Sequence, residues 1–72
     1  MQIHDLERIA KLALRDLGAP DVPITVTAEP QPDRWRLSLG GQYPLTIILR
    51  AGAGTTPQYV RQQIFEQYST NR

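Results

Sequence analysis

The chain has 72 residues, 40% of them apolar and 21% charged, with eight basic and seven acidic side chains, one histidine and no cysteine. This length predicts one small domain, residues 1–72, and the composition is that of a folded chain. The missing cysteine excludes disulfides and thiolate sites, and no apolar run approaches the roughly 20 residues of a membrane span.

Residues 1–5 lack the basic and apolar regions of a secretory signal, so we expect a cytoplasmic protein without membrane contact. With one histidine and no cysteine we expect no metal, and we expect no cofactor. A chain this short buries only about 60% of its unfolded surface. A catalytic cleft of roughly 300–1,000 Å³ would consume much of such a core. We therefore expect a binding module and not an enzyme.

The first predicted element is a helix over residues 3–17. Gly18 and Pro20 follow it, which is typical of a helix end. Arg8, Lys11 and Arg15 form a basic line on the polar side. The apolar residues recur at the spacing of one helical face: Leu6, Ile9, Ala10, Ala13, Leu14 and Leu17.

Residues 24–28, 34–39 and 43–50 alternate between apolar and polar side chains, which predicts three strands. Gly40 and Gly41 indicate a two-residue hairpin between the second and third strands. Pro44 indicates that the third strand is an edge strand or begins at Leu45, because proline donates no hydrogen bond.

A second helix is predicted after the glycine-rich turn. Thr55 or Thr56 caps it and Pro57 lies in its first turn. We expect it to end near Ser69, with a flexible tail at about residues 70–72. Val60, Ile64 and Tyr68 form its inward stripe, with Phe65 beside them.

The predicted fold is therefore α+β: a two-layer α-β-β-β-α arrangement in which a three-stranded antiparallel meander carries both helices on one face. The other face is left open. Its side chains would be Thr25, Thr27, Arg34, Arg36, Ser38, Thr46, Ile48 and Arg50.

Charge is unevenly spread along the chain. Residues 1–33 hold three basic and six acidic residues, whereas residues 34–72 hold five and one. Either the basic half faces an anionic partner, or the two halves fold over one another and the charges mix. We favour mixing.

The turn Gly52-Ala53-Gly54-Thr55-Thr56 connects a strand to a helix start, where backbone N–H groups can hold an anion. It lacks the third glycine of a dinucleotide fingerprint and the lysine of a P-loop. The alternative is a turn that only reverses the chain, and turn chemistry favours that alternative.

The order of elements resembles the double-stranded-RNA-binding domain, and Gly52 to Thr56 resembles the Gly-x-Gly-x-Ser sequence before that family's second helix. The resemblance implies RNA contacts from the first helix, the first hairpin loop and the start of the second helix. The family's Lys-Lys-x-Ala-Lys motif falls on residues 57–61, where only Arg61 is charged, and the loop histidine is absent. The resemblance thus implies weak nucleic-acid binding or none.

We expect the module to bind another protein or a second copy of itself, because an antiparallel sheet has exposed edges. The alternative is binding of double-stranded RNA or DNA, expected to be weak. The residues expected at a protein interface are Tyr43, Ile48, Tyr59 and Phe65. Those expected at a nucleic-acid interface are Arg8, Lys11, Arg15, Gly52, Gly54, Thr56 and Arg61.

Overall fold

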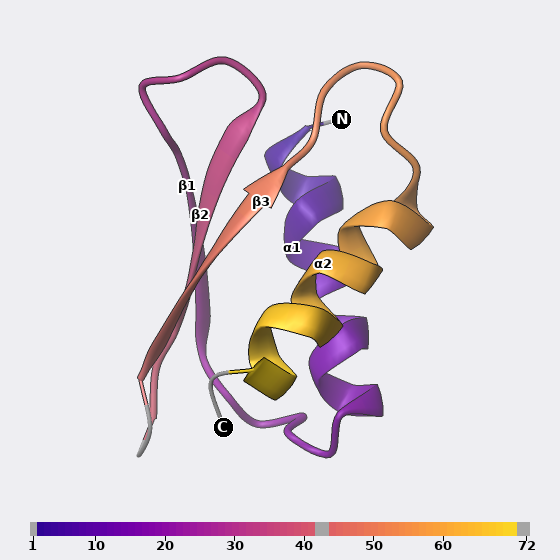
Figure 1. Ribbon diagram of the computed structural model, residues 1–72. Coiled ribbons are helices and arrows are strands. Elements are labelled where there is room, and N and C mark those ends of the chain that lie inside the picture. Colours follow the sequence, from indigo (N-terminus) through magenta and orange to yellow (C-terminus); the bar gives the residue numbers. More distant parts are fainter. Residues whose placement is uncertain (1, 42–43, 71–72) are drawn as a thin grey trace.

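The computed structural model describes residues 2–41 and 44–70. A helix is followed by three strands and a second helix, and both helices lie on the same side of the sheet (Figure 1). The α+β order and the antiparallel meander predicted from the sequence are confirmed. No helix among the described residues is both long enough and apolar enough to span a membrane.

Helix α1 spans Ile3–Asp16 and buries Leu6, Ala10, Ala13 and Leu14. At its start, the Asp5 carboxylate accepts a hydrogen bond from the backbone N–H of Gln2 at 3.0 Å. At its end, Gly18 has φ of 83°, and the N–H of Ala19 donates to the carbonyl of Leu14 at 2.8 Å. This is a Schellman end, and it explains the glycine, since a side chain disfavours positive φ.

Strands β1 (Ile24–Ala28), β2 (Arg34–Leu39) and β3 (Leu45–Arg50) form one antiparallel sheet in the order β1-β2-β3. Leu39 pairs with Leu45, so five residues of the sequence separate the paired ends of β2 and β3. The prediction of a two-residue hairpin at Gly40 and Gly41 is therefore wrong, and the alternative start of the third strand at Leu45 is confirmed. Pro44 directly precedes β3, a position that proline tolerates.

Helix α2 spans Pro57–Thr70, one residue beyond the predicted end. Thr56 caps it, since its hydroxyl oxygen accepts a hydrogen bond from the N–H of Tyr59 at 3.2 Å. Thr70 belongs to the helix and its hydroxyl donates to the carbonyl of Glu66. Of the predicted tail, residues 71–72 lie outside the described residues.

The core lies between the sheet and the two helices. Trp35 is only partly buried and its indole N–H donates to the carbonyl of Ala51 at 3.0 Å. Its polar end thus finds a partner at the core boundary, as large amphipathic rings require. The fully buried large side chains are Leu6, Leu14, Leu37, Ile47, Leu49, Val60 and Ile64.

Candidate interaction surfaces

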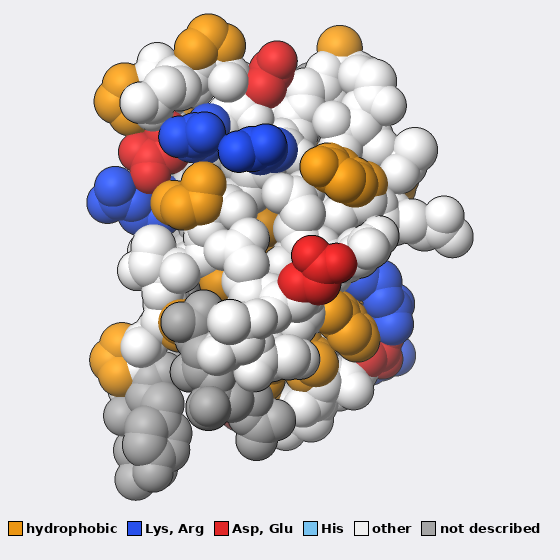
Figure 2. All heavy atoms as spheres, viewed as in Figure 1, with side chains coloured by type: hydrophobic (Ala, Val, Ile, Leu, Met, Phe, Trp, Pro, Cys, Tyr) orange, Lys and Arg blue, Asp and Glu red, His pale blue; other side chains and the backbone are white. Residues whose placement is uncertain are grey.

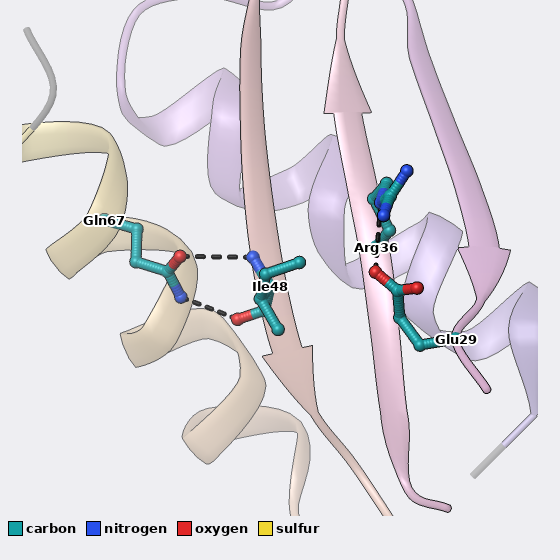
Figure 3. Close-up of polar contacts among 4 residues, drawn as sticks. All are labelled: Glu29, Arg36, Ile48 and Gln67. Atoms are coloured by element: carbon teal, nitrogen blue, oxygen red, sulfur yellow. Dashed lines mark hydrogen bonds and ion pairs between the residues drawn. The ribbon is translucent and has the colours of Figure 1, made fainter. Parts of the chain in front are cut away.

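Two glutamine side chains from α2 bond to the outer edge of β3: Gln67, shown in Figure 3, and Gln63. The carboxamide of Gln67 accepts from the N–H of Ile48 at 3.1 Å and donates to its carbonyl at 2.7 Å. Gln63 makes the same pair of bonds with Arg50, both at 2.9 Å. Each carboxamide therefore takes the place that a peptide group of a fourth strand would occupy.

This pairing repeats because the rise between the two glutamines along α2 matches the rise between their partners along β3. Gln63 and Gln67 are four residues apart, a rise of about 6 Å along a helix. Ile48 and Arg50 are two residues apart, which spans about 6.8 Å along an antiparallel strand. Because α2 runs antiparallel to β3, successive helical turns meet successive outward peptide groups of the strand.

Strand β1 forms the other edge of the sheet, and its outer side is open. Thr25, Thr27 and Glu29 direct their peptide groups toward β2, as the bond from the N–H of Glu29 to the carbonyl of Arg34 shows. Because peptide groups alternate in direction along a strand, those of Ile24, Val26 and Ala28 point outward. No described residue is hydrogen bonded to these outward groups. Of the two sheet edges, β3 is therefore covered at Ile48 and Arg50, whereas β1 is open.

A shallow hollow adjoins the start of β1. Lys11, Leu12 and Arg15 of α1 border it on one side and Val22 and Ile24 on the other. Leu12 is 46% exposed, which is unusual for a leucine. The hollow extends the open edge of β1 toward the helical layer.

Of the residues predicted for a protein interface, the three that the structure describes lie on two different elements, β3 and α2. Ile48 lies partly buried on the open face of the sheet, and Tyr59 is 49% exposed on α2. Phe65 packs at the margin of the core, with the guanidinium of Arg61 4.9 Å from its ring centre. Tyr43 lies outside the described residues.

Two of the basic residues predicted for nucleic acid are engaged within the protein. Arg61 pairs with Asp16 of α1 at 2.6 Å, and Arg8 pairs with Asp5 at 3.6 Å. Lys11 and Arg15 are exposed and have no ion pair among the described residues. The predicted mixing of charges therefore occurs between the helices, and it leaves two free cations on α1.

The turn at Gly52, Gly54 and Thr56 closes on itself. The N–H of Gly52 donates to the hydroxyl of Thr55 at 2.8 Å, and the N–H of Thr55 donates to the carbonyl of Gly52 at 3.2 Å. The Asp33 carboxyl lies so close to Gly52 that a Cβ added at residue 52 would be 2.8 Å from the Asp33 Cγ. A carboxylate in this position repels a bound phosphate, so the geometry favours a turn that reverses the chain.

Two features of these surfaces were not singled out from the sequence. One is the pair Gln63 and Gln67, and the other is the pair Arg34 and Arg50, which lie directly opposite each other on β2 and β3. The signal for the glutamines is their four-residue spacing, and the signal for the arginines is the strand register. Neither pattern predicts a surface feature until the strand register and the position of α2 are known.

No group of three or more histidine, aspartate or glutamate side chains that could hold a metal ion occurs within residues 2–41 and 44–70. Comparisons with protein-family models, with curated proteins and with solved structures gave no match to this chain. The candidate surfaces therefore rest on the geometry alone.

Proposed function

We propose that this protein is a self-associating binding module in which β1 pairs with β1 of a second copy. The observation that carries the proposal is the difference between the two edges of the sheet. Glutamine side chains cover β3, whereas the outward peptide groups of β1 have no partner among the described residues. An uncovered edge offers backbone donors and acceptors to another strand.

The sequence of β1 suits pairing with itself. Its five residues, Ile24 to Ala28, carry no charge and no proline, so the usual protection of an edge strand is absent. A two-fold axis at Val26 would form about six backbone hydrogen bonds. It would also set Thr25 of one copy opposite Thr27 of the other on the open face, a favourable cross-strand pair.

The flank of α1 adds charge complementarity. Asp16 marks the side of α1 that meets α2, because it binds Arg61. Glu7 and Lys11 lie one turn apart on the other flank, and Lys11 borders the hollow beside Ile24. Since α1 runs antiparallel to β1, the two-fold axis would bring Lys11 of one copy toward Glu7 of the other.

The test is the mass of the protein across concentration by sedimentation equilibrium. We expect a reversible dimer. Replacing Thr25 and Thr27 together by lysine places like charges opposite each other and should weaken dimerisation by more than about tenfold. The matched control is Thr46→Lys with Ser69→Lys, which adds the same two charges at exposed positions away from β1.

A charge exchange provides a second test of the same interface. Glu7→Lys should weaken the dimer, and adding Lys11→Glu should restore it, because the pair is only reversed. Ile48→Lys should leave the dimer intact, since Ile48 lies on the covered edge strand. A protein that stays monomeric at high concentration, or a dimer that only Ile48→Lys dissociates, would contradict the proposal.

A further inference from the structure

Three arginines lie close together on the open face, where β2 begins and β3 ends. Arg34 is the register partner of Arg50, and Arg36 follows Arg34 on the same face of β2. Figure 2 shows Lys and Arg side chains side by side over this end of the sheet. Arg36 is the register partner of Thr27 in β1, whereas Arg34 and Arg50 pair with each other beyond the paired residues of β1. The binding partner of Arg34 and Arg50 is therefore argued separately from the proposed dimer.

Arg34 and Arg50 are held at the short cross-strand distance. The carbonyl of Arg34 bonds to Glu29 of the chain before β2, and the peptide groups of Arg50 bond to Gln63 of α2. The two residues therefore form a non-hydrogen-bonded antiparallel pair, in which Cα atoms are about 4.5 Å apart and side chains are closest. Like charges in this position repel each other unless an anion lies between them.

The protein supplies one counterion for this cluster. Glu29 binds Arg36 at 3.0 Å, and its side chain is 13% exposed (Figure 3). Arg34 and Arg50 make no ion pair with any described residue. The carboxyl of Asp33, the neighbouring acid, lies against Gly52. Of the three arginines, Arg34 and Arg50 have no ion-pair partner among the described residues.

We propose that Arg34 and Arg50 bind a phosphate group between their guanidinium groups. A phosphate dianion carries the charge that compensates both arginines, whereas a carboxylate compensates one. The planar guanidinium fork also matches phosphate oxygens in a bidentate manner. The backbone of Arg50 is fixed on both its N–H and its carbonyl by Gln63, so the strand positions are set before the ligand arrives.

The phosphate group itself is the recognised part of the ligand. The described residues of the open face are threonine, serine, isoleucine, arginine and Glu29, with no aromatic ring on which a nucleobase could stack. The ligand is therefore inorganic phosphate or a phosphate monoester, and the site needs no contact with a base.

The experiment is titration of the ¹⁵N-labelled protein with inorganic phosphate at constant ionic strength, followed by the Arg Nε–H and backbone amide shifts. We expect saturable shifts at Arg34 and Arg50. Arg34→Gln and Arg50→Gln should each weaken binding by about tenfold or more, because each removes one charged fork. Arg15→Gln is the matched control: it removes one unpaired arginine charge from α1 and should leave phosphate affinity unchanged.

Two further titrations, with glycerol 3-phosphate and with acetate, identify the source of the phosphate group and test the specificity of the site. If inorganic phosphate binds more tightly than glycerol 3-phosphate, the proposal holds and the ligand is free phosphate. If glycerol 3-phosphate binds more tightly, the proposal holds and the ligand is a phosphate monoester. Acetate that binds as tightly as phosphate would overturn the proposal. So would shifts that grow linearly without saturation, or an equal loss of affinity in Arg15→Gln. Dimerisation is measured separately, so its failure leaves this test unaffected.

Discussion

The side chain of Gln67 is hydrogen bonded to both backbone groups of Ile48, at 3.1 Å to its N–H and 2.7 Å to its carbonyl. A primary carboxamide carries the same donor and acceptor as a peptide group. At Ile48, and likewise at Arg50 through Gln63, the edge strand is therefore satisfied without a fourth strand, and α2 is fixed along β3 by the same bonds. A helix that contributes one buried stripe also protects the sheet from pairing at this edge.

Gln67→Ala should destabilise the protein by about 1–3 kcal/mol, because it leaves the partly buried backbone groups of Ile48 without these partners. Gln62→Ala is the control, since Gln62 is exposed and, among the described residues, its side chain bonds to that of Glu66 one turn away. It should cost less than about 0.5 kcal/mol. Urea unfolding at equal dilution measures both, and equal losses would contradict a special role for Gln67.

The alternation of apolar and polar residues was enough to predict the three strands and the buried face. Val26, Leu37 and Ile47 are buried as the two-residue period requires. The loop before β3 was mispredicted because Gly40 and Gly41 fit a tight hairpin locally. The pairing of Leu39 with Leu45 outweighs that local preference.

The interaction surfaces were harder to predict because they depend on relations between elements. Glutamine is neutral in a hydrophobic pattern, so Gln63 gives no signal until α2 is known to run along β3. Arg61 was expected to remain free for phosphate, but it meets Asp16 across the contact between the helices. Helix packing and strand register decide which charges remain unpaired. The periodicity of the sequence alone predicts neither the packing nor the register.

Leu37→Ala should cost about 2–5 kcal/mol, because Leu37 is fully buried at the centre of the middle strand. This loss is comparable to the whole stability of a small domain, so the variant is expected to be largely unfolded. Leu12→Ala removes the same atoms from a side chain that is 46% exposed and should cost far less. Circular dichroism during denaturation compares the two, and a Leu37→Ala protein as stable as the parent would contradict the core assignment.

Arg50→Gln should stabilise the protein by about 0.2–1 kcal/mol at low salt, because it removes repulsion from Arg34 across the strands. The gain should fade as salt screens the pair. In phosphate buffer the sign should reverse, since the parent would then be stabilised by its ligand and the variant would not. Thermal unfolding in chloride and in phosphate at equal ionic strength measures both effects. A gain that is independent of salt and anion would show that repulsion is not its cause.

Binding of duplex RNA or DNA should be weak at physiological salt and should depend only modestly on salt. Arg8, Lys11 and Arg15 share one face of α1, but Arg8 is paired with Asp5 and Arg61 with Asp16. Lys11 and Arg15 alone would release counterions, so a plot of log affinity against log salt for DNA should have a slope of about −1.8. With Arg8 and Arg61 also free, four phosphate contacts would give a slope of roughly −3 to −4. Replacing Arg8, Lys11 and Arg15 together by glutamine should abolish the residual binding to all sequences alike. Tight binding with the steeper slope, lost in that triple variant, would make duplex binding the better account of this surface.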